Sequence, residues 1–283
     1  MLRRRKNAET QSAGVSALLT LLFLLQSTGI VYGQQEGPLQ LISPLGRPLH
    51  AQTDSGEQVD NTETWMELGL ALAGSWRYQQ AIDAYSEGLY RDPFNALLYR
   101  HRGHRFISTR RFEAAAADLE LSARLDPGNW DTWYHLGLAH YLLGNFDRAE
   151  PAYLKCYELT QEGDDGSLVA VSDWLWMTLM RQDKADEASL ILEKIHTDME
   201  VGENTSYHRR LLMYKGLLNP QDLIAEDAAD LEIATSGYGV GNYYMVTGRQ
   251  EEALDTFKKV VSGPYWPAFG FIAAEADLSR IIK

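Results

Sequence analysis

The chain has 283 residues, of which 45% are hydrophobic and 23% charged, enough apolar material for one large domain or two small ones. Its formal net charge of -13 argues against nucleic acid and anionic lipid as partners, because both attract basic surfaces. The single cysteine, Cys156, excludes an intramolecular disulfide, and we expect it to be a small buried residue.

The first 33 residues have the pattern of a secretory signal peptide. A basic start from Arg3 to Lys6 precedes an apolar stretch from Val15 to Leu25, and a cleavage site is predicted before Gln34. We therefore expect export, to a periplasm or to the exterior. An uncleaved signal would instead anchor the protein in the inner membrane. No cysteine stands at the end of the apolar stretch, where a lipoprotein would carry its lipid, so a lipid anchor of that type is not expected.

Residues 34–61 are predicted to form an extended linker or arm. Three prolines and several glycines and serines interrupt any periodic pattern in this range. The stretch 39–45 is apolar for a linker, and we expect it to lie against the first structural repeat.

Three series of residues recur with a step of 34 positions in the middle of the chain. A shared period of this length predicts tandem helix–turn–helix units. Small residues let the two helices of a hairpin approach closely, and large residues fill the remaining space. The series are Gly69, Gly103 and Gly137; Ala81, Ala115 and Ala149; and Trp65, Tyr99 and Trp133.

The period divides the chain into segments. Three regular hairpins are expected over 62–163, and an irregular hairpin with an extra helix over 164–233. A late hairpin follows over 234–267, and a capping helix over 268–283. We expect the polar side chains of that last helix to face solvent, as an array needs at its end. They are Glu275, Asp277 and Arg280.

These positions resemble the tetratricopeptide repeat (TPR) pattern, in which small residues stand at repeat positions 8, 20 and 27. The resemblance implies an all-α fold, a right-handed superhelix of helical hairpins with a C-terminal capping helix. Such a solenoid has an extended concave face that binds peptides or proteins.

Four stretches narrow the resemblance: 100–107, 133–141, 172–177 and 207–216. They look like those of exported bacterial TPR proteins. The overall layout is also similar to periplasmic TPR lipoprotein adaptors, which present cell-wall hydrolases to a protease, although the lipid-anchor cysteine is missing. The resemblance implies a non-enzymatic interaction scaffold or adaptor in the bacterial envelope.

In TPR hairpins, positions 2, 5, 9 and 12 of the first helix face the concave groove. At such positions this chain has a cationic point followed by an aromatic and methionine-lined stretch, which suits a peptide with an acidic or C-terminal carboxylate group. The predicted peptide-binding residues are Arg100, His104, Tyr134, Tyr141, Asp173 and Met177.

Two basic clusters, 99–106 and 207–210, allow a second interpretation as internal charge networks. Arg102 takes a position that is normally apolar, so it needs a buried partner, and Glu113 or Asp118 would serve. In the second cluster Arg210 would pair with Asp173. The sequence leaves ligand binding and internal pairing both open.

No motif indicates a metal, a cofactor or a catalytic nucleophile, so we predict no catalytic residues and no enzyme. A histidine- and arginine-based enzyme or small-ligand sensor is one alternative, built around His101, His104, Tyr207 and His208. A structural, homo-oligomerising spacer is the other. We expect no nucleic-acid partner, and no tight membrane association if the signal is cleaved.

Overall fold

The computed structural model describes residues 61–224 and 228–281, and every regular element in these ranges is a helix. The predicted all-α class is confirmed. The signal expected over 1–33 and all but the last residue of the arm expected over 34–61 lie outside the described residues.

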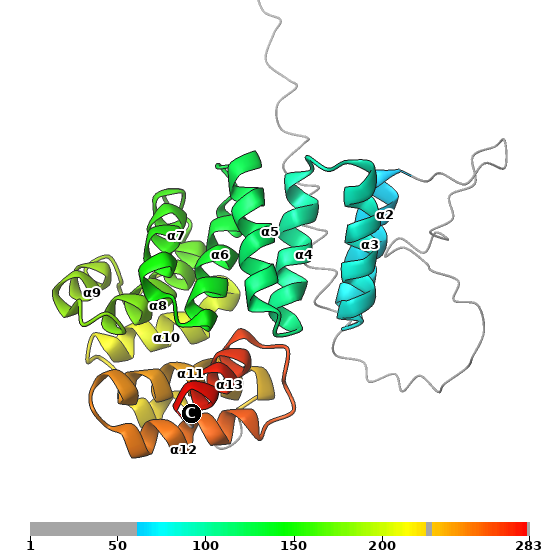
Figure 1. Cartoon of the computed structure of the whole chain (residues 1–283). Coiled ribbons are helices and arrows are strands. Elements are labelled where there is room, and N and C mark those ends of the chain that lie inside the picture. The colour runs from blue at the N-terminus through cyan, green and yellow to red at the C-terminus, as the bar shows by residue number, and fades with distance from the viewer. Residues whose placement is uncertain (1–60, 225–227, 282–283) are drawn as a thin grey trace, which may run out of the picture.

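Consecutive helices pair as antiparallel hairpins stacked side by side (Figure 1). The first three pairs are α2 (Thr62–Gly74) with α3 (Tyr78–Arg91), α4 (Ala96–Ser108) with α5 (Phe112–Leu125), and α6 (Trp130–Leu143) with α7 (Phe146–Glu158). The fourth pair is α8 (Asp165–Met180) with α9 (Ala185–Leu192). The chain continues through η1 (Gly202–Asn204), α10 (Thr205–Tyr214), η2 (Pro220–Leu223), α11 (Asp230–Val246), α12 (Gln250–Val261) and α13 (Phe269–Ile281).

The 34-residue step is visible in how the hairpins begin and pack. Asn61, Asn95 and Asn129 each cap the first helix of a regular hairpin through a side-chain oxygen that accepts a backbone N–H bond. Inside each regular hairpin, the glycine that recurs with this step leaves no room for a larger residue. A Cβ added at Gly137 would lie 2.6 Å from the Tyr153 ring. The predicted role of the small residues is therefore confirmed.

The fourth hairpin departs from this pattern at Trp176, which stands where the regular hairpins have glycine. Its ring stacks on Tyr214 of α10, with centroids 3.7 Å apart and planes at 7°. A residue of this size does not allow the close helix approach that glycine permits. Helix α8 packs against α10 as well as against α9. The irregular stretch predicted after residue 163 thus contains the helix that covers α8.

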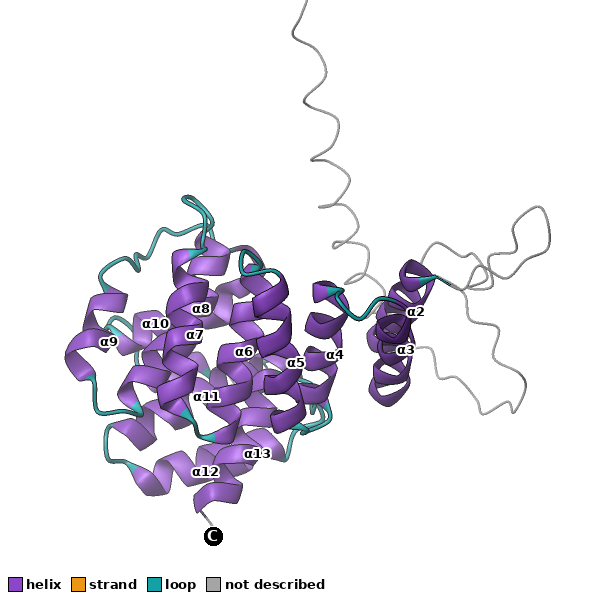
Figure 2. Ribbon diagram, turned by 45° about the horizontal axis from the view of Figure 1, so that its top comes forward, coloured by secondary structure: helices purple, strands orange, loops and turns teal. Residues whose placement is uncertain are grey.

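The described residues contain two hydrophobic cores. The first hairpin and Leu98 form a small core of their own. The larger core begins at Ile82 of α3 and includes buried residues from α4 to α13. Figure 2 shows α2 and α3 at one end of the molecule, beside the compact body that holds the other helices.

The last three helices fold back on the array. Figure 1 shows α11 and α13 across the ends of the central helices, and α13 contacts α6 as well as α11 and α12. The expectation of a solvent-facing cap is wrong for Asp277, which is 1% exposed and paired with Arg181 at 2.7 Å. Glu275 binds Arg110, so this polar side of α13 faces the array.

Candidate partner-binding face

Arg100 lies on α4 and is paired within the chain. Its guanidinium is 2.9 Å from the Asp131 carboxylate, and the two side chains are 14% and 52% exposed. Burial opposes ionisation of Asp131, but the charge and hydrogen bond of Arg100, together with the nearby histidines, hold the pKa of that carboxyl below its usual value. A partner carboxylate at Arg100 would therefore share the cation with Asp131.

His104 packs as a neutral ring. Its centroid is 4.2 Å from that of His135 and 5.3 Å from that of Phe269 on α13. Burial, together with the charge of Arg105, lowers the pKa of His104 well below its ordinary value. This corrects the expectation that His104 supplies a cation for an anionic ligand.

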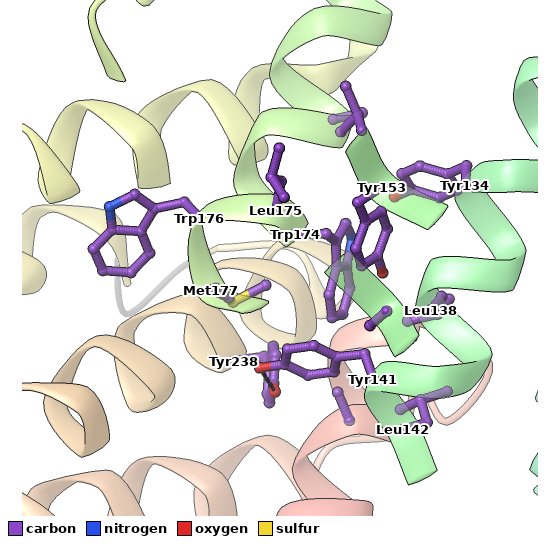
Figure 3. Packing of buried hydrophobic residues seen from close by; sticks show 14 of the residues in the cluster. Tyr134, Leu138, Tyr141, Leu142, Tyr153, Trp174, Leu175, Trp176, Met177 and Tyr238 are labelled. Carbon is purple, nitrogen blue, oxygen red and sulfur yellow. Dashed lines mark hydrogen bonds between the residues drawn. The ribbon is translucent and has the colours of Figure 1, made fainter. Parts of the chain in front are cut away.

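Tyr134 and Tyr141 point into the interior from α6 (Figure 3). Tyr141 is fully buried, and its hydroxyl lies 2.7 Å from the Tyr238 hydroxyl and 3.2 Å from Asn242 Oδ1. Tyr134 is 6% exposed and stacks on Trp130 with centroids 5.0 Å apart. Both rings are therefore committed to packing within the chain.

Asp173 and Met177 on α8 are also fully buried. Arg210 from α10 reaches both, 2.7 Å from the Asp173 carboxylate and 3.1 Å from the Met177 sulfur. Burial raises the pKa of Asp173 to about 7, against the opposing effect of the arginine. The predicted pairing of Arg210 with Asp173 is confirmed, and the 207–210 cluster is an internal network at this residue.

Arg102 in the first basic cluster is likewise internal. It donates two hydrogen bonds to Asp118, at 2.7 and 2.9 Å, and one to Ser86 at 3.0 Å. Of the two predicted partners, Asp118 is the one used. A paired, planar geometry of this kind favours a guanidinium over other cations.

The predicted peptide-binding set is therefore corrected for Tyr141, Asp173 and Met177. These side chains have no exposed surface, because the chain's own α10, α11 and α13 cover the concave positions of the third and fourth hairpins. The alternative site is also not assembled in the structure, because its histidines have separate partners. Its predicted members are His101, His104, Tyr207 and His208. His208 bonds the carbonyl of His196, whereas His104 packs on Phe269.

The concave positions nearest the N-terminal end remain open. Leu70 at repeat position 9 is 39% exposed, and Leu97 at position 2 of the next repeat is 44% exposed. Met66 at position 5 of the first repeat is half-buried. Together with Arg100, these three residues form what we call the open face.

The repeat pattern does not single out the residues that join α13 and the segment before it to the array, among them Trp76, Arg110 and Arg181. One signal was present. Trp76 and Arg110 stand at the turn position where Gly144 and Gly248 occur in other hairpins, and all four have positive φ. A bulky residue at such a position is uncommon and indicates a special contact.

Within 61–224 and 228–281, no cluster of three or more histidine, cysteine, aspartate or glutamate side chains is arranged to hold a metal ion. The helices of these ranges also include none with the length and hydropathy needed to span a bilayer.

Comparison with known proteins agrees with the repeat pattern. Residues 102–164 match the sequence profile of the family described as "Tetratricopeptide repeat". The "Heat-shock protein cognate (HSC) co-chaperone sgt12" of Aspergillus fumigatus is 30% identical over 116 residues, 41% of this chain and 33% of that protein. The "Small glutamine-rich tetratricopeptide repeat-containing protein 2" of Saccharomyces cerevisiae is 31% identical over 141 residues, 50% and 39% of the two chains.

Solved structures give more distant similarities. The protein YrrB, titled "a TPR protein with an unusual peptide-binding site", has a TM-score of 0.46 and 18% identity, covering 81% of this chain and 99% of its own. A structure titled "Crystal structure of MamA protein" has a TM-score of 0.45 and 18% identity, covering 71% and 90%. The chain spans well under half the length of both curated relatives named above. The hairpin geometry and the family match together show a tetratricopeptide repeat at residues 102–164, within an all-helical array of hairpins.

Proposed function

We propose that the chain is a non-enzymatic protein-interaction scaffold that binds a peptide or protein segment on the open face. The observation that carries this proposal is the exposure of Leu70 and Leu97 at concave positions, at 39% and 44%. Apolar side chains left in water at the concave positions of a repeat array favour partner binding.

The chemistry of the open face fits an apolar segment that also carries a carboxylate. Leu70, Leu97 and Met66 offer apolar contact, and Arg100 stands at the concave position 5 of the second repeat. The carboxylate now paired with Arg100 belongs to Asp131, which is 52% exposed. A partner carboxylate would add to or replace this half-solvated ion pair, forming a charge-assisted hydrogen bond.

The test is a comparison of peptide binding by the natural chain and a Leu70→Ser/Leu97→Ser variant. Peptides are first selected on the natural chain from a random displayed library. Their affinity for the variant is expected to be at least about tenfold lower, since both apolar contacts are lost. Fluorescence anisotropy of the selected peptides measures this.

A Leu190→Ser/Leu217→Ser variant is the matched control, because Leu190 and Leu217 are 60% and 56% exposed outside the open face. It should bind the peptides as the natural chain does. Equal binding by the Leu70→Ser/Leu97→Ser variant would remove the open face as the binding site.

We also propose export, to a bacterial periplasm or to the exterior, on the strength of the N-terminal sequence pattern. Expression in a bacterium should yield a processed chain that begins at Gln34 and leaves the cytoplasm. The intact mass of the purified protein measures the cleavage. A chain that keeps its first 33 residues and stays in the cytoplasmic fraction would contradict the proposal.

A further inference from the structure

Five turns that join paired helices share one backbone geometry. In each, the residue after a positive-φ position donates its N–H to a carbonyl five residues earlier, as Arg111 does to Phe106 and Asn145 does to His140. The positive-φ residues are Trp76, Arg110, Gly144, Asp183 and Gly248. Glycine adopts this conformation without steric cost, and aspartate tolerates it better than bulky residues do.

The two bulky residues at these turns are the ones that touch the segment before α13. The Trp76 ring makes edge-on contacts with Tyr265 and Trp266, with centroids 5.6 and 5.9 Å apart. Arg110 donates to the Trp266 carbonyl at 3.0 Å and lies 5.5 Å from the ring centroid of that residue. Arg110 also donates to Glu275 at 2.8 Å. The two turns with a strained backbone therefore both contact the same segment, and such strain persists where surrounding contacts hold it.

A third wall is formed by Tyr78, whose ring is 5.5 Å from that of Trp266. The guanidinium of Arg105 lies over the Tyr78 ring, 4.9 Å from its centroid. Aromatic rings backed by guanidinium groups bind aromatic and carboxylate groups well, because they offer both stacking and charge.

The segment that occupies this place looks like a ligand rather than a core element. Residues 263–267 read Gly-Pro-Tyr-Trp-Pro and lie between α12 and α13, where two prolines restrict the backbone. Trp266 is still 37% exposed and Trp76 40% exposed. The Arg110–Glu275 pair has side-chain exposures of 28% and 40%, so water weakens it.

We propose that Trp76, Tyr78, Arg105 and Arg110 form a second binding site, the turn-edge site, for a partner segment in which aromatic and proline residues precede a carboxylate. Residues 263–267 with Glu275 are its resident occupant. The turn-edge site uses none of the residues of the open face, so its test does not depend on the proposed function.

Tethering explains why the resident segment is held. A segment joined by a short linker competes at an effective concentration on the order of millimolar. A free peptide of the same sequence must overcome that competition, and its apparent affinity for the natural chain is low. Removing the resident aromatic groups while leaving the site intact should reveal the full affinity.

The probe is a fluorescent synthetic peptide with the sequence of residues 262–277, and its binding is followed by anisotropy. A Tyr265→Ala/Trp266→Ala variant, called the emptied variant, is expected to bind the peptide at least about tenfold more tightly than the natural chain. Equal affinity for the two proteins would overturn the proposal.

Two further substitutions in the emptied variant locate the site. Arg110→Gly removes the guanidinium and places the preferred residue at a positive-φ turn, so peptide binding should be lost without damage to the hairpin. Asp183→Gly makes the same backbone change at an exposed turn position away from the segment and should leave binding unchanged. Retained binding after Arg110→Gly would also overturn the proposal.

Circular dichroism checks that each variant keeps its helices, and a Trp266→Ser single variant replaces the emptied variant if that protein unfolds. Adding Leu70→Ser/Leu97→Ser to the emptied variant should not change the affinity for this peptide. A loss there would assign the peptide to the open face and contradict the turn-edge site, whatever the outcome for the proposed function.

Discussion

Replacing Arg210 by alanine is expected to lower the free energy of unfolding by about 3–5 kcal/mol. Arg210 and Asp173 both have fully buried side chains, 2.7 Å apart. Without the arginine, the carboxylate would remain buried and lose its counter-charge. Because the pKa of Asp173 is raised to about 7, protonation relieves part of this penalty in mild acid, and the loss should be larger near pH 8. Urea unfolding followed by tryptophan fluorescence measures it.

Arg209→Ala is the matched control. This neighbour pairs with Glu232 at 3.3 Å and is 35% exposed, so its removal should cost less than about 1 kcal/mol. An Asp173→Leu/Arg210→Met double variant should recover most of the lost stability, because it leaves no unpaired charge. A cost for Arg210→Ala no greater than that for Arg209→Ala would contradict the assignment of a buried pair.

Acid is expected to destabilise the protein steeply below about pH 6.5, because the folded chain lowers the pKa of four histidines. Burial, followed by the charge of Arg100, lowers the pKa of His101 and that of His135 to about 3. The pKa values of His104 and His140 shift in the same direction, chiefly through burial. In the unfolded chain these histidines bind protons as the pH falls below their ordinary pKa of 6.5. In the folded chain they stay neutral at the same pH. Their stabilising effect is therefore present above 6.5 and lost as the pH falls toward 3.

The size of this effect follows from the number of groups. Each histidine contributes at most about 1.4 kcal/mol per pH unit. Asp173 works in the opposite direction, since its pKa is raised and the folded chain keeps its proton up to about pH 7. The net loss is at most about 4 kcal/mol per pH unit below 6.5.

Urea midpoints at a series of pH values from about 7.5 to about 5 measure the slope. A His104→Phe variant keeps a ring against Phe269 and removes one titrating group, so its slope should fall by about a third. His196→Asn, at an exposed histidine, serves as the control and should leave the slope unchanged. Midpoints that do not move with pH would show that the histidines are accessible to protons in the folded chain.

The parts of this structure that could be predicted from the sequence depend on local geometry. Gly137 faces Tyr153 because residues 16 apart meet inside a hairpin, and this contact recurs with the period. The same spacing joins Arg102 to Asp118. A buried arginine needs a carboxylate, so the partner could be named once the hairpin was recognised.

The closure of the array could not be predicted in this way. Tyr141 meets Tyr238 across 97 positions and Arg110 meets Glu275 across 165, and no periodicity links such residues. Asp277 looks like an ordinary polar residue of a terminal helix until the chain's return places Arg181 beside it. The predicted groove residues were therefore located correctly in their helices, while the chain that covers them was not foreseen.

The long-range contacts of α13 also change the physics of unfolding. In an open solenoid each hairpin touches only its neighbours, so the array frays from its ends and gains stability unit by unit. Here the bond between Arg110 and Glu275 connects an early turn with the last helix. The last helix then cannot leave without weakening an early hairpin, and a chain of nearly independent units becomes one cooperative body. Folding must close a long loop before this contact forms, which slows the final step while making the finished structure harder to open piecemeal.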